Sequence, residues 1–513
     1  MKRVVLPLLV CLIICASSFS QQYVGKRIYL QKNTGNNTLG IGPGFNYHAG
    51  DTLVLTANQN PYSWAQFTNI DSVTIINEGG QVVLNWFDNG SIPGGFIFIG
   101  CKHIHLTGTG VRGIKYGFKI TTPANRGVGV DIHDRSAWFE VDHCEMYNKA
   151  SGFWIKEEVQ CADSLSFPNW VLHNFKIHDN YIHNCSLEGM YLGSTDPNNY
   201  AGTDSSQHPV VYCNGIATKH KPMRLGNFHI YNNIIDSTGR GAIQLSDADS
   251  GKNEINNNTI TNAGFELNGY QGNGIVLGGY SHAYIHDNYV NYTYSTGIFS
   301  LGAGMVKIIN NTVDHSGTIG KISESGVPNI MVDTRNTTVP SPGQPNPVML
   351  TFKVRGNKLG ANTDYGIRVY NTYMTFTTDN AVCDNRTLSG LSASHYVATG
   401  VYWKGECDTG ALNTKNYVQH NAVAQTLNKA SSIIYPNPAK DVVNVNFGDN
   451  VSGKVMLSIY DEQGRMLQTK SIYKNVSQTQ QSFDVKTLQP GVYNLQIVSA
   501  AEKTNLRFIK AGD

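Results

Sequence analysis

Titratable side chains gather around one long insertion in the middle of the chain, residues 193–227. Paired carboxylates about 5–9.5 Å apart are the groups that hydrolyse glycosidic bonds. A base together with a cation that neutralises a uronic carboxylate supports elimination by a lyase instead. Both sets of groups occur here, and both reactions fit. The candidate catalytic residues are Asp247, Asp249, Glu188, Lys219, His220 and Arg224.

The prediction depends on the cluster, because a single charged residue in a loop is usually no more than a solvated group. Long insertions in a regular repeat are places where function concentrates. We expect Asp247 and Lys219 to lie outside the packed interior. We also expect one of the acids and one of the basic residues to approach within about 10 Å, the span of one sugar unit and a bridging water.

One six-residue pattern recurs six times in the elements that must position these groups. Each copy has an aliphatic residue at both ends and Asn at its fourth position, and the copies are residues 177–182, 230–235, 255–260, 285–290, 308–313 and 354–359. Most copies precede a second short apolar segment. A period of about 20–30 residues built from strands and turns, without helical periodicity, is typical of a β-solenoid.

The repeated Asn is predicted to lie at a turn between two strands. Asn tolerates a left-handed backbone there. Stacked Asn side chains can also satisfy turn amides that would otherwise be buried without partners. We therefore expect Asn233, Asn258 and Asn288 to stack in adjacent coils, with the flanking Ile230 and Ile235 buried.

These phased repeats resemble the right-handed parallel β-helix of the pectate-lyase-like superfamily, over roughly Tyr23 to Tyr402. The resemblance implies an all-β solenoid whose strands alternate inward aliphatic and outward polar residues. It does not specify a reaction. A long flat strand face with loops rising from it suits an extended sugar chain, so we expect a polysaccharide or another glycan as the partner.

Alignment of the second strands places one residue of each coil in an outward column, formed by Asp131, Trp154, Tyr191, Gln244 and Val276. Trp154 and Tyr191 would form an aromatic platform for sugar rings, or they would pack under the insertion. Neighbouring coils lie about 4.8 Å apart, so these side chains share one wall with the insertion. The candidate substrate-binding residues are Trp154, Tyr191, Gln244 and Lys156.

The first residues indicate export. Met1 to Arg3 is basic, residues 4–16 are apolar and small residues follow, so we predict a signal peptide over residues 1–20. Its removal takes away two of the 39 basic residues and none of the 37 acidic ones, which leaves a neutral mature chain. Such a chain has no global field that would attract nucleic acid. We expect a monomer without a nucleic-acid partner.

Two of the nine cysteines lie in the predicted signal peptide. Among the others we predict a disulfide between Cys383 and Cys407, which bracket one irregular stretch, and as second choice one between Cys185 and Cys213. Cys144 stands where a ladder Asn would otherwise be, and we expect it as a small buried thiol. No Cys-x-x-Cys pair is present, so no zinc motif is predicted. The cofactor is unknown from the sequence, with calcium as one candidate.

The composition changes near residue 421. Residues 421–431 are small and polar and form a predicted linker between a β-helix domain, 21–420, and a C-terminal domain, 432–513. The C-terminal domain contains several short alternating strands with Gly and Pro turns, which predicts a small β-sandwich. Its motifs are Tyr435-Pro-Asn-Pro438, Asp461-x-x-Gly-Arg465 and Leu488-x-Pro-Gly-Val-Tyr493.

This motif set closely resembles the C-terminal sorting domain of the type IX secretion system. The resemblance implies recognition by the type IX secretion machinery and transport across the outer membrane, followed by release or surface anchoring. Together with the signal peptide it predicts a secreted or cell-surface protein. Without the resemblance, the sandwich would equally fit a carbohydrate-binding or immunoglobulin-like module.

Two classes of function fit a secreted β-helix of this kind. The first is an enzyme that degrades polysaccharide, either a polysaccharide lyase or a glycoside hydrolase. The second is a non-catalytic adhesin or glycan-binding module whose solenoid is a rigid spacer. A pure spacer needs neither the insertion nor an outward Trp154 and Tyr191, which favours the enzyme.

Overall fold

The computed structural model is built from β-strands, with one short 3-10 helix, Ala57–Gln59 (η1), among the described residues. The chain divides into two compact units, a solenoid and a C-terminal sandwich. None of the described residues forms a helix long and apolar enough to cross a bilayer. The structure describes residues 25–85, 94–123, 125–157, 169–193, 211–213, 216–218, 223–248, 250–269, 271–279, 281–302, 304–320, 322–333, 351–370, 381–388, 402–403, 432–435, 439–447, 453–461, 465–474, 480–499 and 503–511.

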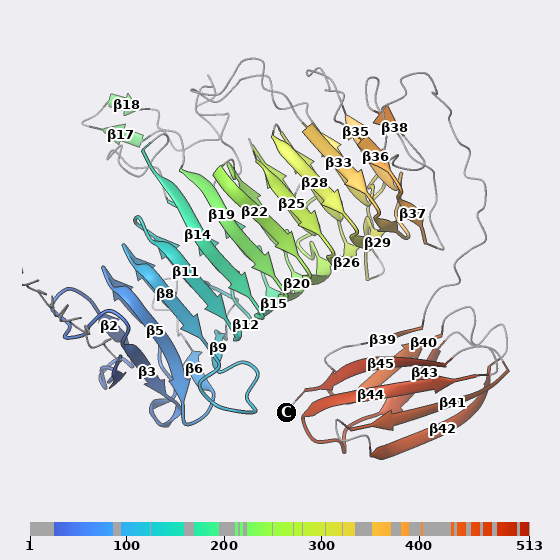
Figure 1. Cartoon of the computed structure of the whole chain (residues 1–513), viewed down its shortest axis with the longest axis horizontal. Coiled ribbons are helices and arrows are strands. Elements are labelled where there is room, and N and C mark those ends of the chain that lie inside the picture. Colours follow the sequence, from blue (N-terminus) through green and yellow to red (C-terminus); the bar gives the residue numbers. More distant parts are fainter. Residues whose placement is uncertain are drawn as a thin grey trace, which may run out of the picture. The chain divides into compact units, whose positions relative to one another are not determined.

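Three long parallel sheets build the solenoid (Figure 1). Sheet A contains β1 (Arg27–Tyr29), β3 (Thr52–Thr56), β5 (Asp71–Glu78), β8 (Lys102–Thr107), β11 (Ala137–Asp142), β14 (Val171–His178), β19 (Arg224–Tyr231), β22 (Ser250–Asn256), β25 (Ala283–His286), β28 (Met305–Ile309), β33 (Thr351–Arg355), β36 (Ala381–Cys383) and β38 (Tyr402–Trp403). Sheet B contains β2 (Leu39–Ile41), β4 (Ala65–Thr68), β7 (Phe96–Ile99), β10 (Val128–His133), β13 (Ser151–Ile155), β16 (Met190–Leu192), β21 (Ile243–Ser246), β24 (Ile275–Gly278), β27 (Ile298–Leu301), β32 (Ile330–Asp333) and β35 (Ile367–Tyr370).

Sheet C closes the third side of most coils. It contains β6 (Val82–Asn85), β9 (Phe118–Thr121), β12 (Cys144–Tyr147), β15 (Tyr181–Cys185), β20 (Ile234–Thr238), β23 (Thr259–Ala263), β26 (Tyr289–Thr293), β29 (Thr312–Ser316), β34 (Lys358–Leu359) and β37 (Arg386–Thr387). Two small hairpins project from the coils, formed by β17 (Val211–Cys213) with β18 (Ile216–Thr218) and by β30 (Thr318–Ile319) with β31 (Ile322–Ser323). The predicted all-β parallel solenoid is confirmed.

An asparagine ladder runs through the turn between sheets A and C. Each ladder side chain donates from Nδ2 to Oδ1 of the next over 2.9–3.1 Å, along Asn180, Asn233, Asn258, Asn288, Asn311, Asn357 and Asn385. Ile230 and Ile235 are fully buried, so the predicted phasing is confirmed. Cys144 takes the Asn position one coil earlier. It is buried as predicted, and its backbone N–H donates to Asn180 Oδ1 at 3.0 Å.

The left-handed backbone lies one residue before each ladder position, not at the ladder Asn where we expected it. Positive φ angles of 52–57° occur at Asp179, Asn232, Asn257, Asp287 and Asn310. Short polar side chains tolerate this conformation because they have little bulk to clash with the backbone. The left-handed backbone at this position explains why the third residue of each copy is Asp, Asn or Gly.

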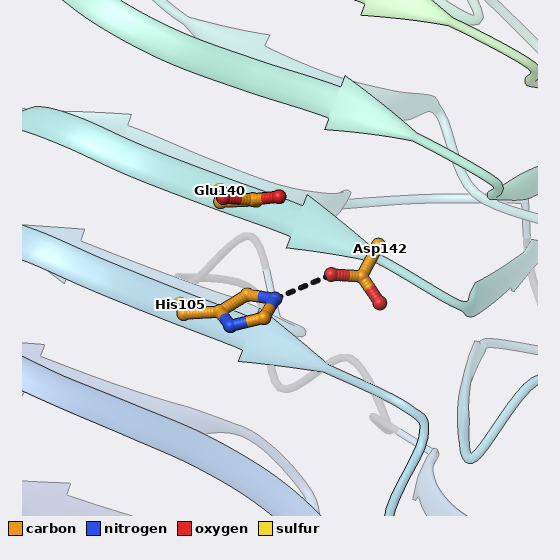
Figure 2. Close-up of side chains that lie close together, drawn as sticks. All are labelled: His105, Glu140 and Asp142. Atoms are coloured by element: carbon orange, nitrogen blue, oxygen red, sulfur yellow. Dashed lines mark hydrogen bonds and ion pairs between the residues drawn. The ribbon is translucent and has the colours of Figure 1, made fainter.

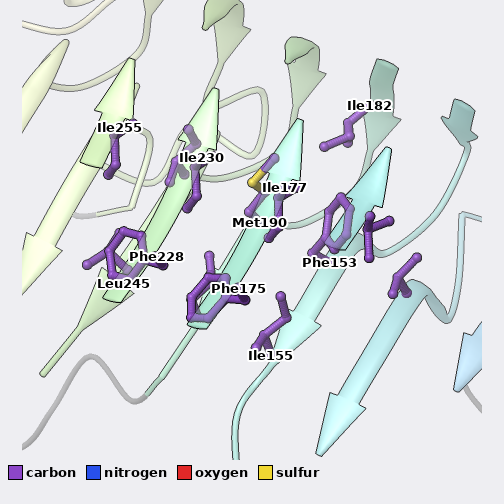
Figure 3. Close-up of a cluster of buried hydrophobic side chains, with 14 of the residues drawn as sticks. Phe153, Ile155, Phe175, Ile177, Ile182, Met190, Phe228, Ile230, Leu245 and Ile255 are labelled. Carbon is purple, nitrogen blue, oxygen red and sulfur yellow. The ribbon is translucent and has the colours of Figure 1, made fainter. Parts of the chain in front are cut away.

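The interior between the sheets is filled with aliphatic and aromatic side chains (Figure 3). Phe139, Phe175 and Phe228 come from β11, β14 and β19 and stack in one column, with ring centroids 4.9 and 5.0 Å apart. The strand register pairs these same residues. Because side chains alternate along a strand, inward stacking of this column decides which residues of sheet A face outward.

The cysteines correct one of the two predicted pairings. Cys185 is a free thiol buried in the interior, so the second-choice pairing with Cys213 is wrong. Burial raises the pKa of the Cys185 thiol to about 12, which keeps it protonated and unreactive. Cys383 is disulfide-bonded. Cys407 lies outside the described residues, so its pairing with Cys383 stays a prediction.

The C-terminal unit consists of two small antiparallel sheets. One contains β39 (Ile433–Tyr435), β40 (Val442–Asn446) and β43 (Gln480–Asp484), and the other contains β42 (Met466–Lys474), β41 (Gly453–Tyr460), β44 (Gly491–Val498) and β45 (Lys503–Lys510). The unit has its own hydrophobic core, which includes Val443, Leu457 and Phe508. The predicted linker at residues 421–431 lies outside the described residues.

Replacing Asn258 with Ala should lower the free energy of unfolding of the solenoid by about 2–4 kcal/mol, because buried ladder partners lose their hydrogen bonds. Asn258 donates to Ile230 O and Asn288 Oδ1 and accepts from Asn233. The half-buried Asn291 lies outside the ladder and provides a matched Asn→Ala control. Denaturant unfolding measures both variants. Equal losses would mean that the ladder is not a main source of stability.

Candidate functional site

A groove of about 560 Å³ lies on the outward face of sheet A. Its floor is made by five neighbouring strands, β8, β11, β14, β19 and β22. At about 4.8 Å per strand, the groove extends about 19 Å along the solenoid axis. Its polar and aromatic lining includes His103, His105, Trp138, Glu140, Lys176, His229, Lys252 and Glu254.

The register of sheet A places outward side chains in two adjacent columns. Glu140 pairs with a residue on each side in the first column, and Asp142 does the same in the second. We call this block of six residues the first array. It comprises His105, Glu140 and Lys176 in one column and Thr107, Asp142 and His178 in the other.

His105 and Asp142 form the closest contact between the two columns. His105 Nε2 lies 2.5 Å from Asp142 Oδ2 (Figure 2). Asp142 Oδ1 accepts a hydrogen bond from Thr107 Oγ1 at 2.6 Å and lies 2.5 Å from His143 Nδ1. The side chain of Asp142 is 3% exposed and that of His105 is 41% exposed. A buried carboxylate therefore orients an imidazole that solvent or a ligand can reach.

Glu140 and His178 form the second contact of the array. His178 Nε2 lies 2.8 Å from Glu140 Oε1, and His178 Nδ1 lies 2.8 Å from Asp179 Oδ2. Lys176 Nζ donates to Glu140 Oε2 at 3.2 Å. The ring of Tyr231 stacks on His178 with centroids 4.5 Å apart.

The contacts within the array shift the pKa values of its two acids and of His105 in opposite directions. Burial alone would raise the pKa of Asp142, but hydrogen bonds from His105, His143 and Thr107 hold that pKa well below its usual value. Burial would also raise the pKa of Glu140, but contacts from His178 and Lys176 lower it. The contact with Asp142 raises the pKa of His105 against the opposing effect of burial. Both carboxylates are therefore ionised near neutral pH, and His105 holds its proton more firmly than a free imidazole does.

Three of these side chains can also hold a metal ion. Ligand atoms of His105, Glu140 and Asp142 lie within 4.8 Å of one another. One imidazole nitrogen and two carboxylate oxygens suit a divalent transition metal better than calcium, which prefers oxygen ligands. The ammonium group of Lys176 on Glu140 opposes a cation at this point.

Trp138 forms an aromatic surface at one end of the groove. It is 36% exposed. Its ring stacks on that of His103, with centroids 5.0 Å apart, and lies edge to face with that of His173, with centroids 4.3 Å apart. Trp138 has a φ of 52°, in a column of left-handed residues that are small or polar on the neighbouring strands, such as Asn174 and Asn227. A bulky residue is costly in this conformation, and such strain concentrates at functional sites.

The predicted outward column on sheet B has the expected register, but three of its five residues, Asp131, Gln244 and Val276, are buried. Asp131 pairs with Trp154, Trp154 with Tyr191, Tyr191 with Gln244, and Gln244 with Val276. The rings of Trp154 and Tyr191 meet edge to face, with centroids 4.9 Å apart.

Lys156 covers this predicted aromatic platform. Its Nζ lies 4.5 Å from the ring centroid of Trp154 and 5.0 Å from that of Tyr191. These are cation–π distances, so the ammonium group occupies the surface that a sugar ring would need. Gln244 is buried, with an exposed fraction of 6%. The substrate-binding role of these four residues stays a prediction.

The predicted catalytic residues are placed only in part. Asp247 was expected outside the packed interior but is buried, because it follows β21 at the corner where the chain turns into sheet A. Its carbonyl accepts a hydrogen bond from the N–H of Leu225, so it neighbours Arg224 at the start of β19. Glu188 is buried, with Oε1 3.6 Å from Arg240 Nη1. Asp249, Lys219 and His220 lie outside the described residues.

Sequence reasoning missed the whole of sheet A as a site, although a signal was present. Outward positions on this sheet lie two and four residues before the ladder position. At Cys144 these positions are Asp142 and Glu140, and at Asn180 they are His178 and Lys176. Alignment of the first strand of each coil, like the alignment of the second strands, would have placed these titratable residues side by side.

Two family models match the chain. Residues 224–437 match the right-handed beta helix region, and residues 433–511 match the secretion system C-terminal sorting domain. The chain is a β-helix protein with a type IX secretion sorting domain. This domain indicates that the protein is secreted or located at the outer surface of the cell.

Solved structures add only a distant likeness. The A-module of mannuronan C-5 epimerase AlgE6 from Azotobacter vinelandii shares 14% identity, with 70% of this chain and 91% of that chain covered and a TM-score of 0.36. The tailspike protein of Acinetobacter baumannii phage AM24 shares 9% identity, with 90% and 67% covered and a TM-score of 0.35. At these TM-scores neither likeness carries an argument about activity. No curated protein sequence matches the chain significantly.

Proposed function

We propose that the groove on sheet A binds an extended glycan and that His105 transfers a proton within it. The observation that carries this proposal is the His105–Asp142 pair, an accessible imidazole held by a buried carboxylate beside an elongated groove. General acid–base catalysis requires a positioned group of this kind. Trp138 supports a sugar as the ligand, because the 36% of this residue that His103 and His173 leave exposed offers apolar aromatic surface to a sugar ring.

The electrostatics favour elimination over hydrolysis. A glycoside hydrolase that uses two carboxyl groups needs one of them protonated through a raised pKa. The pKa values of Glu140 and Asp142 are both lowered, whereas that of His105 is raised. The imidazolium can therefore protonate the leaving glycosidic oxygen. In elimination the ionised carboxylate of Glu140 accepts the proton from the carbon beside the uronic carboxylate, the bond to the leaving oxygen breaks as His105 protonates that oxygen, and a carbon–carbon double bond forms.

The proposed activity is therefore that of a polysaccharide lyase, with a glycoside hydrolase as the next class. A non-catalytic glycan-binding protein is the second candidate function, and the aromatic surface at Trp138 supports it equally. The set predicted from the sequence, Asp247, Asp249 and Lys219, is the alternative location for catalysis. If that location is correct, replacing Asp247 or Lys219 with Ala abolishes activity.

A screen of the exported protein against polygalacturonate, alginate, hyaluronan and dextran tests the proposal. Two readouts are recorded together, the absorbance of unsaturated uronate ends and the release of reducing ends. A lyase raises both, a hydrolase raises only the second, and a binding protein raises neither while it retains the glycan on an affinity gel. The absence of both turnover and retention for every uronic polymer tested would contradict the proposed function.

The pH profile provides a separate prediction for the variant Asp142→Asn. Asp142 raises the pKa of His105, so the protonated donor persists to higher pH than in a free imidazole. Removing the carboxylate removes this effect, and the pKa of His105 falls. The alkaline limb of the kcat/KM profile should therefore move to lower pH, together with a fall in the maximal rate. An alkaline limb that does not move would mean that His105 is not the proton donor.

A further inference from the structure

A second block of six outward residues on sheet A repeats the geometry of the first array. The register pairs His229 with Glu254 and Glu254 with Tyr284, and it pairs Tyr231 with Asn256 and Asn256 with His286. Each residue lies three strands beyond its counterpart, because β19, β22 and β25 correspond to β8, β11 and β14. We call this block the second array. It comprises His229, Glu254 and Tyr284 in one column and Tyr231, Asn256 and His286 in the other.

The two contacts between the columns correspond in the two arrays. His229 Nε2 lies 2.5 Å from Asn256 Oδ1, the same distance as from His105 Nε2 to Asp142 Oδ2. His286 Nε2 lies 2.7 Å from Glu254 Oε1, where the corresponding contact in the first array measures 2.8 Å.

The contact of the other ring nitrogen of this histidine is repeated as well. His286 Nδ1 lies 2.7 Å from Asp287 Oδ2, and His178 Nδ1 lies 2.8 Å from Asp179 Oδ2. Three contacts thus recur within 0.1 Å, and a shared backbone register alone does not require matching side-chain types at four positions.

One chemical difference separates the arrays at their centre. Asn256 stands where the first array has Asp142, so an amide replaces the carboxylate beside the imidazole. An amide oxygen accepts a hydrogen bond but carries no charge, and it stabilises an imidazolium less than a carboxylate does. The second array therefore keeps three contacts of the first and lacks the carboxylate beside its imidazole. Tyr231 and Tyr284 stand where the first array has Thr107 and Lys176, so the hydrogen bonds that those two residues donate have no counterpart.

The groove connects the two arrays. Its lining extends from His105 in the first array to His229 and Glu254 in the second. Corresponding residues are three strands apart, about 14 Å along the solenoid axis. Tyr231 links the arrays, because its ring stacks on His178 of the first while it belongs to the second. One extended chain lying in the groove would contact both.

We propose that the second array is a glycan-binding subsite that holds a more distant unit of the same chain without transferring a proton. This inference rests on the proposed function of the first array. Glu254, with a side chain 28% exposed, presents the carboxylate for sugar hydroxyl groups, and Tyr284 presents a ring stacked on His286 at 4.0 Å. Contacts at both arrays raise the affinity of the groove for long chains above its affinity for short ones.

Binding measured in the His105→Asn background, in which turnover is slow, tests the subsite with little loss of the glycan. The probes are long chains and short oligomers of polygalacturonate, alginate and hyaluronan. Glu254→Gln should weaken the binding of long chains about tenfold, the effect of one charge-assisted hydrogen bond, and leave short oligomers unchanged. Lys358→Gln, on sheet C, is the control and should change neither. Equal binding of long chains by both variants would overturn the subsite.

A gain of activity provides the second measurement. In the Asp142→Asn background, Asn256→Asp restores a carboxylate beside His229 and should raise turnover of long chains at least about tenfold, because it supplies the charge that proton transfer needs. If a folded double variant shows no gain in turnover, the missing carboxylate is not the reason why the second array transfers no proton. Failure of the proposed function can be told apart from failure of the subsite. If the proposed function is wrong, the wild type lacks turnover, however its binding depends on chain length.

Discussion

Replacement of His105 with Asn should lower turnover of the glycan by about 10²- to 10⁴-fold, the range that a positioned general acid contributes. The side chain of Asn keeps a hydrogen-bonding group beside Asp142 but cannot deliver a proton. Because His105 is 41% exposed and lies outside the hydrophobic core, the variant should fold. Initial rates on the polymer identified by the screen, with thermal unfolding of the same preparation, measure both effects.

His183→Asn is the matched control for this experiment. His183 also contacts a carboxylate, with Nε2 3.2 Å from Glu145 Oε1, but it lies in β15 on sheet C, away from the groove. The control should retain wild-type turnover. Full activity of the His105 variant, or an equal loss in both, would show that His105 is not the proton-transfer group.

Removal of residues 432–513 should abolish delivery of the protein to the outer surface while the solenoid remains folded. Those residues contain the matched sorting domain, and the solenoid and the sandwich are separate compact units with separate hydrophobic cores. Each unit therefore has a hydrophobic core of its own, and we expect the solenoid to fold without the sandwich. Protease treatment of intact cells, which degrades only surface-exposed protein, measures delivery, and a cooperative thermal transition of the purified solenoid measures folding.

Two outcomes would contradict this prediction. A truncated protein that still reaches the surface would show that the address lies elsewhere in the chain. The substitution Asn505→Ala, in β45 of the same domain, is a mild control that should leave delivery intact. A truncated solenoid without a cooperative transition would contradict the independence of the two units.

The phasing of the solenoid could be predicted because one physical demand recurs in every coil. A buried turn amide needs a partner, and the Asn repeated at residues 233, 258 and 288 supplies it. The rung at Asn385 was missed because Arg386 and Thr387 follow it in place of the aliphatic end. The left-handed residue was placed one position late, since Asn at either position is compatible with the sequence alone.

The site could be predicted less well, because outward residues face no packing constraint that marks them in the sequence. The column on sheet B was found through its aromatic residues, Trp154 and Tyr191, and its register proved correct. His105, Glu140 and His178 lie on three different coils and meet only through the register of sheet A. Their separation along the chain varies with each insertion, so no fixed spacing reveals them.

Hydroxyl-radical footprinting of the inactive His105→Asn variant, with and without bound glycan, tests the central claim most directly. The two faces carry matched reporters, because Trp138 lies on β11 in sheet A and Trp154 lies on β13 in sheet B. Tryptophan oxidises readily, and a bound chain shields it from the radical. We predict that saturating glycan lowers the oxidation of Trp138 severalfold and leaves that of Trp154 unchanged. Protection of Trp154 with Trp138 unchanged would contradict the account and move the site to the Asp247 corner.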